Sequence, residues 1–339
     1  MKDNILLGKN PTELQDIAKS LGMPAFTGKQ LAEWLYKKRA ASFDEMSNIS
    51  LKNRQLLSEH YSIGRSLPSI ETVSNDGTKK YLFETEYGAV ESVYIPEEDR
   101  ATLCVSSQVG CKMNCLFCMT GKQGFSGNLT ATEILNQILS IPDSEKLTNI
   151  VYMGMGEPMD NTLEVLRSLN AMTEKWGLAW SPHRITLSTI GLIPGMKQFL
   201  EHSECHLAIS LHNPFGEERL QLMPIEKAYP IVKVVEELKK HDFAHQRRLS
   251  FEYIVFEGKN DSQRHASELV RLLKGLPCRI NLIRFHAIPE IDLKSPNSEK
   301  MIRFRDYLSE NGIICTIRRS RGEDILAACG MLSSKKSNI

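Results

Sequence analysis

The stretch GCKMNCLFCMTG at residues 110–121 places Cys111, Cys115 and Cys118 in a C-x3-C-x2-C pattern. Iron–sulfur clusters are held by thiolates, usually four for a four-iron cube, so three close thiolates leave one iron open to a small molecule. A structural zinc site needs four protein ligands, commonly in two pairs, and the neighbouring sequence offers no second pair. Three unrelated buried thiols would need no fixed spacing. The pattern therefore favours an iron–sulfur cluster over a zinc knuckle or scattered thiols.

Strand-like and helix-like segments alternate around this loop and through the rest of the chain. Repeated βα units predict a parallel sheet, and about six or seven of them predict a full or partial barrel. The strand-like runs are 102–108, 149–154, 184–189, 206–212, 250–256, 279–285 and 313–319, and the helical runs are 130–141, 161–175, a short one after Pro194, 230–241, 262–274 and 298–311. Because barrel active sites lie on loops after the carboxyl ends of strands, the cysteine loop is expected there.

The first hundred residues differ from this alternating pattern. Residues 1–70 are predicted to form a small helical unit, because apolar residues recur on one face and cations follow at a helix end. Residues 71–99 are predicted to be a β-rich linker in which Gly88 turns a hairpin. The barrel is assigned to 100–332 and a disordered tail to 333–339.

Composition restricts the class of protein. The chain has 339 residues, of which 41% are hydrophobic, so a large core is expected. Its formal charge is only +1, so any surface for nucleic acid must be local, with candidate patches at 37–39, 247–248 and 318–321. No leader or membrane-spanning run is recognised, and clustered cysteines are typical of an intracellular protein, so we expect the cytoplasm and no membrane partner.

Five segments in order along the chain are similar to one family. CVSSQVGC at 104–111, the cysteine loop, GMGEP at 154–158, SLH at 210–212 and RRSRGEDILAACG at 318–330 together resemble the RlmN/Cfr family of radical S-adenosylmethionine RNA methyltransferases. The resemblance implies a partial (β/α)6 radical-SAM barrel with a [4Fe-4S] cluster on the three cysteines. It also implies S-adenosylmethionine as the second cofactor, with two molecules consumed per turnover.

The resemblance assigns cofactor contacts to residues on the loops after the barrel strands. A glutamate in GMGEP can pair with the methionyl ammonium, and its glycines allow close approach of the backbone. At the place where related sequences have an asparagine, this chain has His286 in NLIRFH, and a histidine offers fewer hydrogen bonds than an amide. The cofactor contacts assigned in this way are Gly156, Glu157, Ser188, Ser210, Leu211, His212 and His286.

The resemblance also assigns three catalytic residues. Cys329 would carry the methyl group, Cys104 would resolve the intermediate by forming a disulfide, and Glu91 would accept a proton. From the residues alone, we expect the arginines before Cys329 to lower the pKa of its thiol. Strand alternation from Cys104 is expected to place Ser106 and Gln108 on the same face, whereas Glu91 by itself would be an exposed strand carboxylate.

The implied substrates are RNA molecules with an accessible adenine, and the helical unit at 1–70 and the arginine-rich strand are expected to contact them. In the family, RlmN-type enzymes methylate C2 of an adenosine in 23S rRNA and of the adenosine beside the tRNA anticodon, with a reductant such as flavodoxin or ferredoxin. The expected state is a monomer. The sequence leaves open Cfr-like methylation at C8, another radical-SAM activity such as protein activation or methylthio transfer, and a non-catalytic iron–sulfur RNA-binding module.

Overall fold

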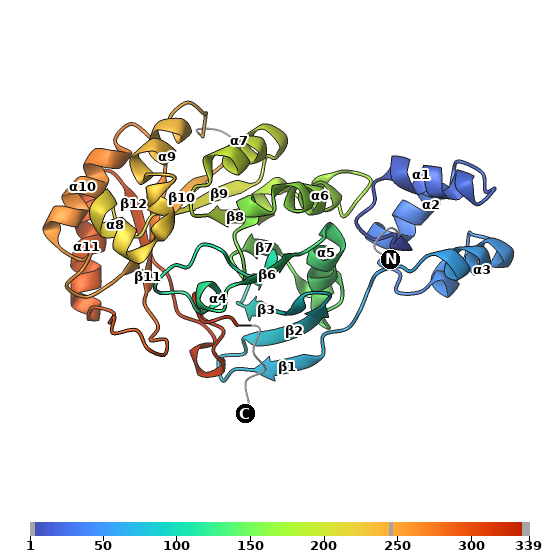
Figure 1. The fold of residues 1–339 in the computed structure, drawn as a ribbon, viewed down its shortest axis with the longest axis horizontal. Helices are drawn as coiled ribbons and strands as arrows, with labels where there is room; N and C mark the ends of the chain where they lie inside the picture. The colour runs from blue at the N-terminus through green and yellow to red at the C-terminus, as the bar shows by residue number, and fades with distance from the viewer. Residues whose placement is uncertain (1–3, 244–246, 334–339) are drawn as a thin grey trace.

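The computed structural model describes residues 4–243 and 247–333, and its centre is a ten-stranded sheet in the order β1-β2-β3-β4-β7-β8-β9-β10-β11-β12. From β4 onward, neighbouring strands pair in parallel, as the alternating sequence predicted. Within the described ranges, β12 is not paired with β4, so the barrel stays open (Figure 1). The parallel strands are β4 (Ala101–Cys104), β7 (Asn149–Tyr152), β8 (Ile185–Thr189), β9 (His206–Ser210), β10 (Leu249–Val255), β11 (Arg279–Arg284) and β12 (Ile314–Ile317).

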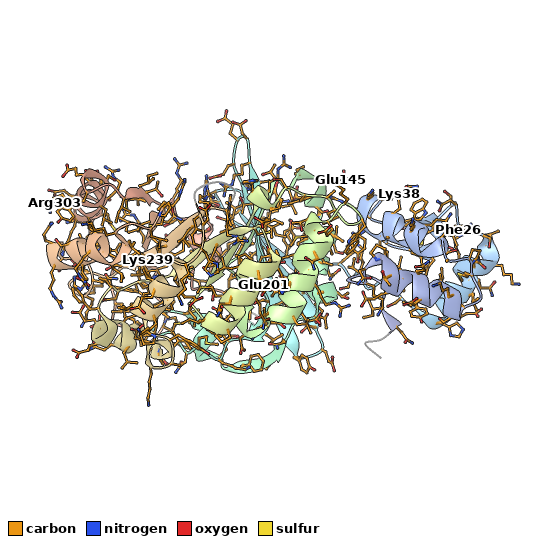
Figure 2. All side chains as sticks on the ribbon, turned by 90° about the horizontal axis from the view of Figure 1, so that it is seen from above. Phe26, Lys38, Glu145, Glu201, Lys239 and Arg303 are labelled. Carbon is orange, nitrogen blue, oxygen red and sulfur yellow. The ribbon has the colours of Figure 1, made fainter. Side chains whose placement is uncertain are left out.

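Helices cover the outer face of the parallel strands. Their apolar stripes face the sheet and their charged residues face solvent, as Glu201 on α7 and Lys239 after α9 do in Figure 2. Each expected helix is present within a few residues of its predicted ends, and α8 is an additional short one. The helices of the barrel are α5 (Ala131–Leu139), α6 (Thr162–Thr173), α7 (Ile193–His202), α8 (Gly216–Leu222), α9 (Ile231–Leu238), α10 (Gln263–Leu273) and α11 (Ser298–Glu310).

The β-rich segment between the helical unit and the barrel extends the barrel sheet. Strands β1 (Ile70–Val73), β2 (Lys79–Thr85) and β3 (Gly88–Pro96) are antiparallel, and β3 pairs with β4. The turn between β2 and β3 lies at Gly88, where the sequence predicted it. Because its hydrogen bonds continue into the parallel strands, this segment is a wall of the barrel rather than the linker that we expected.

The stretch that follows β4 differs from the single long strand expected over 102–108. Strand β4 ends at Cys104, and a separate two-stranded hairpin, β5 (Gln108–Gly110) and β6 (Phe125–Asn128), flanks the cysteine loop and the short helix α4 (Met119–Lys122). Gly110 has a φ of +73°, and a Cβ there would lie 1.9 Å from the carbonyl oxygen of Gly124. The prediction that Cys104, Ser106 and Gln108 share one strand face is therefore wrong, because Cys104 ends β4 and Gln108 begins a strand of another sheet.

The N-terminal helices form a unit beside the barrel (Figure 1). They are α1 (Pro11–Ser20), α2 (Thr27–Ala32), continued by a π-helical turn at Glu33–Lys37, and α3 (Leu51–His60). This unit contacts α5 and α6: Thr132 donates a hydrogen bond to the carbonyl of Leu7 at 2.6 Å, and Arg167 pairs with Glu13 at 2.7 Å. Exposed Phe26 lies on the part of this unit that points away from the barrel, whereas Lys38, also exposed, lies nearer to the barrel (Figure 2).

The chain after β12 returns across the molecule. Residues 321–333 run from the end of β12 back to the antiparallel strands and the cysteine loop (Figure 1). Of the tail predicted at 333–339, all but Ser333 lies outside the described residues. The C-terminal segment therefore brings a part of the sequence that is remote from the cysteine loop into contact with it.

Candidate active site

A cavity of about 190 Å³ lies at the carboxyl ends of the parallel strands, where the barrel geometry predicted a site. Its walls come from the ends of β4, β7, β8 and β9, from the cysteine loop, and from the C-terminal segment. It brings together Cys104 and Cys329, which are 225 positions apart. The predicted site residues that line it are Cys104, Cys118, Gly156, Glu157, Ser188, Ser210, His212 and Cys329.

The cysteine loop packs at one side of this cavity. Cys115 is buried, whereas Cys111 and Cys118 are half-buried, and all three thiols are free. Burial raises the pKa of Cys111 to about 12 and that of Cys115 well above its usual value, and mutual repulsion among the three sulfurs adds to both effects. Such thiols become stable thiolates when a cation binds them, so the donor chemistry fits an iron–sulfur cluster.

Among the described residues, no three His, Cys, Asp or Glu side chains converge closely enough to hold a single metal ion. A four-iron cluster binds each thiolate on a different iron, so its ligands stand farther apart than those of a single zinc ion. The three cysteines would hold the cluster, and the neighbouring strand ends would hold S-adenosylmethionine. The assignment of Cys111, Cys115 and Cys118 as ligands remains a prediction.

The GMGEP loop after β7 is packed tightly against residues that follow β4. Gly156 has a φ of +94°, and a Cβ there would lie 2.5 Å from the Cβ of Gln108. Gln108 accepts a hydrogen bond from the backbone N–H of Glu157 at 2.8 Å, and Ser106 accepts one from Met155 at 2.8 Å. Ser106 and Gln108 therefore brace the loop that carries the predicted cofactor contacts.

Glu157 has a buried carboxylate that the chain itself already engages. It accepts hydrogen bonds from the hydroxyl of Thr189 at 2.5 Å, from the N–H of Ile190 at 2.9 Å and from the N–H of Met159 at 3.0 Å. Burial outweighs these bonds and raises the pKa of Glu157 to about 7. A carboxylate has about four acceptor positions, so one remains for a ligand ammonium in the cavity. Such a cation would favour the charged form of this residue.

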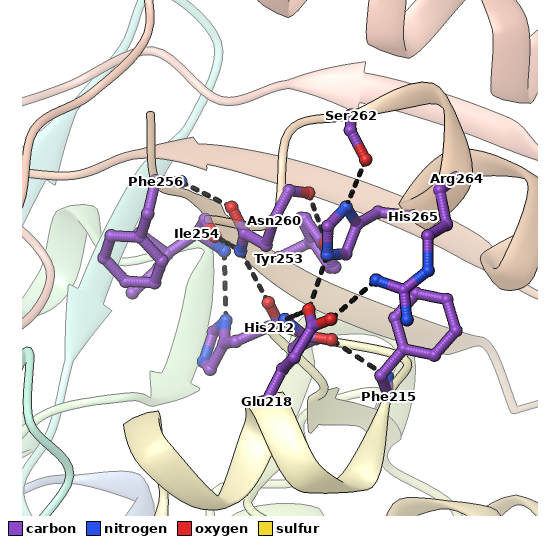
Figure 3. Close-up of polar contacts among 11 residues, drawn as sticks. His212, Phe215, Glu218, Tyr253, Ile254, Phe256, Asn260, Ser262, Arg264 and His265 are labelled. Atoms are coloured by element: carbon purple, nitrogen blue, oxygen red, sulfur yellow. Dashed lines mark hydrogen bonds and ion pairs between the residues drawn. The ribbon is translucent and has the colours of Figure 1, made fainter. Parts of the chain in front are cut away.

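His212 is held in a left-handed backbone conformation, with a φ of +54°, immediately after β9. Its Nδ1 accepts a hydrogen bond from the N–H of Ile254 at 3.0 Å, as Figure 3 shows. Burial lowers the pKa of His212 to about 3, with a further contribution from the nearby charge of Arg219. The ring is therefore neutral near pH 7, and its proton lies on Nε2, available to a ligand.

Asn260 fixes this histidine from behind, and sequence reasoning did not find it. Its amide donates to the carbonyls of His212 at 2.6 Å and Ile254 at 2.7 Å, and accepts from the N–H of Phe256 at 2.6 Å (Figure 3). Farther along the same loops, Glu218 accepts hydrogen bonds from Arg264 and His265. The signal that could have found Asn260 is a polar residue between two apolar runs, a pattern that is too common to be specific.

A second residue that the sequence did not reveal is Arg219, which is fully buried. Its guanidinium donates to the carbonyls of Ser210, Leu211 and Ile190 at about 3 Å, and it forms an ion pair with Glu226. It therefore holds the ends of β8 and β9 together beneath the cavity. Its positive charge also opposes the burial effect on the pKa of Cys115.

Cys329 lies at the cavity, between Cys104 and the cysteine loop. The three positions are close enough that charge on Cys329 raises the pKa of Cys104, and charge on Cys118 raises the pKa of Cys329. Cys329 is accessible from the cavity, yet protein surrounds it, and burial raises the pKa of its thiol despite the charge of Arg318. The expectation that the arginines leave Cys329 with a lowered pKa is therefore wrong. Arg318 does lower this pKa, but the effect of burial is larger and the net pKa is raised.

Glu91 lies on β3 and is buried, not exposed as its strand position suggested. Its carboxylate pairs with Lys80 at 2.9 Å and accepts a hydrogen bond from the N–H of Ser333 at 2.9 Å. Burial raises the pKa of Glu91, and Lys80 and Ser333 partly oppose this. Glu91 does not line the cavity. Its carboxylate contacts the C-terminal segment, which carries Cys329.

Two of the residues assigned as cofactor contacts lie outside the cavity lining. The side chain of Leu211 is fully buried in the core, so only its backbone could contact a ligand. His286 is buried, and its Nδ1 lies 3.2 Å from the carboxylate of Glu323. That contact ties the loop after β11 to the C-terminal segment and leaves only Nε2 of His286 for a ligand.

The predicted basic patches are partly used within the protein. Arg247 is buried and donates to the carbonyls of Cys205 and Leu200, so it is not a surface site. Arg318 lines the cavity and pairs with Glu252 at 3.3 Å. Lys37 and Lys38 remain exposed on the helical unit. In the described part of the chain, no helix is both long and apolar enough to cross a membrane.

Comparisons with known proteins agree with this arrangement. Residues 105–270 match the model of the radical SAM superfamily, and residues 4–63 match that of the ribosomal RNA large subunit methyltransferase N-terminal domain. A probable dual-specificity RNA methyltransferase RlmN from Bacteroides fragilis is 61% identical over 98% of this chain and 96% of its own length. A dual-specificity RNA methyltransferase RlmN from Marinobacter nauticus is 41% identical over 96% of this chain and 92% of its own length.

A solved structure has the same fold over nearly the whole chain. The crystal structure of a radical SAM methyltransferase from Sphaerobacter thermophilus superposes with a TM-score of 0.92 at 36% identity, covering 98% of this chain and 100% of that one. Both the helical unit and the barrel are therefore shared. The chain belongs to the RlmN family of radical S-adenosylmethionine RNA methyltransferases.

Proposed function

We propose that this enzyme methylates C2 of an adenosine in 23S rRNA and of the adenosine beside the anticodon in tRNA, through a methyl group carried on Cys329. The observation that supports this proposal most directly is the meeting of Cys329, Cys104 and Cys118 at one cavity. A non-catalytic iron–sulfur module would have no need to bring two further free thiols to its cluster loop.

The chain supplies positions for both cofactors and a carrier for the methyl group. When bound, a [4Fe-4S] cluster and two molecules of S-adenosylmethionine per turnover would supply the methyl group and the one-electron chemistry. Glu157 binds the methionyl ammonium through its remaining acceptor position, and Nε2 of His212 donates a hydrogen bond to the cofactor. Cys329 loses its thiol proton and takes the methyl group on sulfur.

The remaining residues complete the transfer to the RNA. Once the methyl carbon is bonded to adenine, Glu91 accepts the ring proton, and the Cys104 thiolate attacks the sulfur of Cys329. The carbon that joins adenine to the Cys329 sulfur is a CH2 group, because one hydrogen of the methyl has been removed. When the carbon–sulfur bond breaks, its electron pair goes to this carbon, which takes up a proton, so methyladenine is released and a Cys104–Cys329 disulfide remains. Its reduction, together with reduction of the cluster, requires electrons from outside, for which a flavodoxin or ferredoxin is suited. Burial raises the pKa of Glu91, which makes its carboxylate a better proton acceptor.

The substrate proposal rests on the helical unit and on sequence motifs. The relatives are named dual-specificity RNA methyltransferases, and the N-terminal unit matches a ribosomal RNA methyltransferase domain. GMGEP and RRSRGED resemble the enzymes that act on C2 rather than C8. The exposed cations at Lys37 and Lys38 are the proposed contacts of that unit with RNA phosphates. We expect the enzyme to be in the cytoplasm, because both proposed RNA substrates reside there. We also expect it to be a monomer.

One assay tests this proposal directly. The enzyme, reconstituted anaerobically with iron and sulfide and supplied with S-adenosylmethionine and a reductant, is incubated with 23S rRNA fragments or with tRNA. The RNA is then digested to nucleosides and analysed by mass spectrometry against standards. The expected product is 2-methyladenosine from both RNAs. Recovery of 8-methyladenosine would overturn the position, and the absence of any methyladenosine would favour the non-catalytic module.

A further inference from the structure

The C-terminal segment 321–333, called the strap below, is fastened to the antiparallel strands at the end that precedes Cys329. The carboxylate of Asp324 accepts a hydrogen bond from the hydroxyl of Ser74 at 2.5 Å and one from the N–H of Asn75 at 3.1 Å. The carboxylate of Asp76 accepts one from the N–H of Gly322 at 3.1 Å. The turn between β1 and β2 thus makes a clasp for the strap.

The other end of the strap is fastened to the cysteine loop and to β3. The N–H of Met119 donates to the carbonyl of Gly330 at 2.8 Å, and the hydroxyl of Thr120 donates to that of Leu332 at 2.9 Å. The N–H of Ser333 donates to Glu91. Cys329 is thus suspended between two attachment points, and its own side chain contributes no described hydrogen bond to either.

The strap forms one whole wall of the cavity, through Ala327, Ala328, Cys329, Gly330 and Leu332. With the strap in place, the cavity has a volume of about 190 Å³. Pockets for small ligands usually have at least about 300 Å³. The strap therefore limits the space beside Cys329. Gly322 and Leu326 both have positive φ angles, +61° and +54°, and they mark where the chain bends away from the clasp.

We propose that Asp324, with Ser74 and Asp76, is a positioning residue that sets where the Cys329 thiol lies in the cavity. This inference rests on the proposed role of Cys329 as methyl carrier. Cys329 follows Asp324 by five positions, at most about 17 Å along a fully extended chain, so the hydrogen bonds at Asp324 limit where the thiol can lie. Loss of the clasp gives the segment before Cys329 more freedom, while the Gly330 carbonyl stays bonded to Met119.

In this proposal, the antiparallel strands help to position the Cys329 thiol. The turn between β1 and β2 is remote from the cysteine loop in sequence and lines no part of the cavity. It acts on the reaction only through the strap. Hydrogen bonds to the carboxylates also hold the pKa values of Asp76 and Asp324 below their usual range, although burial opposes this at both, so both carboxylates stay charged near pH 7.

The test measures the accessibility of Cys329 in the full-length protein before any cofactor is loaded. Wild type, Asp324→Ala and Ser74→Ala are treated with iodoacetamide at fixed pH, and alkylation of the Cys329 peptide is followed by mass spectrometry. We expect alkylation about tenfold faster in Asp324→Ala, because the segment before Cys329 then opens locally more often and the thiol is held less firmly against the cavity walls. Asp99→Ala, which removes an exposed carboxylate from the turn between β3 and β4, serves as the matched control and should alkylate like wild type.

A double variant and a melting curve separate positioning from general destabilisation. Ser74→Ala combined with Asp324→Ala should alkylate no faster than Asp324→Ala alone, because the two residues act through one hydrogen bond. Thermal unfolding should be nearly unchanged, and Asp324→Glu should restore slow alkylation in part. If Asp324→Ala alkylates at the wild-type rate, or if Asp99→Ala alkylates equally fast, the clasp has no positioning role.

The loaded enzyme gives a second measurement. Asp324→Ala should slow the formation of methyl-Cys329, detected by mass spectrometry, while the affinity for S-adenosylmethionine is unchanged. A normal rate of methyl-Cys329 formation together with unchanged alkylation would refute the clasp. Failure of every variant and of wild type to form methyl-Cys329, with the alkylation difference intact, would instead refute the proposed methyl carrier and leave the clasp standing.

Discussion

The strand-end wall of the cavity and the strap opposite it hold their functional groups by different means. On the strand side, Glu157 and His212 are buried and fixed by several hydrogen bonds from the chain. On the strap side, Cys329 is held only through its neighbours along the chain, at Asp324, Gly330 and Ser333. The difference teaches that the strand-end wall, called the fixed wall below, holds its functional side chains directly, whereas the strap holds its thiol through the backbone on either side.

The largest effect is expected from Cys329→Ala, which removes the group that only the strap supplies. Methyl transfer to RNA should fall below detection in the nucleoside assay, because no other thiol occupies that place in the cavity. The cluster absorbance and the binding of S-adenosylmethionine should be retained, since both belong to the fixed wall. Cys278→Ala, outside the cavity, is the control. Methyladenosine formed by Cys329→Ala would show that the strap does not carry the methyl group.

Cys104→Ala tests the proposed reaction between the two walls. Cys104 is the thiol of the fixed wall whose sulfur must reach the sulfur of Cys329 on the strap. Without it, the Cys329 sulfur cannot be released from the methylated base, so a covalent protein–RNA adduct should accumulate. Denaturing electrophoresis of the reaction with labelled tRNA would detect the adduct, and the double variant with Cys329→Ala should lack it. Normal turnover by Cys104→Ala would show that another group resolves the intermediate.

Asn260→Ala should destabilise the fixed wall by about 4 kcal/mol, because it leaves three buried backbone groups without their partner. Urea unfolding of the metal-free protein measures this change. Asn170→Ala, at an exposed position on α6, should change the free energy of unfolding by less than about 0.5 kcal/mol. A small effect at Asn260 would mean that the loop carrying His212 is as loosely held as the strap.

Glu157 should make the free energy of unfolding depend on pH. Its folded pKa of about 7 lies above the usual 4.5, so the folded state binds this proton more tightly than the unfolded state does. Below pH 4.5 both states are protonated and nothing is lost. Stability then falls by about 3 kcal/mol as the pH rises from 4.5 to 7. Urea unfolding at several pH values should show this slope.

The control for this pH dependence is Glu157→Gln, which cannot ionise. Its free energy of unfolding should vary less between pH 4.5 and 7 than that of wild type. Addition of S-adenosylmethionine to the wild-type protein should oppose the loss, because an ammonium beside the carboxylate favours its charged form. An equal slope in wild type and Glu157→Gln would assign the pH dependence to another group.

Much of the fixed wall was predictable because its residues follow from local pattern. The alternation of strands and helices predicted the barrel, and the positions of Ser188, Ser210 and His212 at strand ends predicted where they would meet. The chain could not reveal that β4 ends at Cys104, because the apolar run continues through Val105. The break there is enforced by the tight packing of the GMGEP loop, which is a contact between distant segments.

The strap shows where prediction from sequence ends. Nothing local to Asp324 indicates that it bonds to Ser74, 250 residues earlier. The burial of Glu91 was missed for a related reason: strand alternation gives the face of a residue but not what covers that face, and here the covering segment is the strap itself. Likewise the net pKa of Cys329 depends on desolvation by the folded cavity, whereas the sequence displays only the neighbouring arginines.

The smallest expected effect separates backbone strain from packing within the fixed wall. Ala at Gly156 must adopt a φ near +94° and also place its Cβ 2.5 Å from Gln108, whereas Ala at Gly258 must adopt a φ near +68° in open space. Both changes carry the strain of a left-handed residue, about 1 kcal/mol. Only Gly156→Ala adds a clash, which should make it about 2 kcal/mol more destabilising than Gly258→Ala. Urea unfolding of the two variants gives this difference directly, and equal losses would mean that the GMGEP loop can shift to relieve the clash. Since Gln108 also holds the N–H of Glu157, such a shift would have to carry the carboxylate with it, and the cofactor wall would then be as adjustable as the strap.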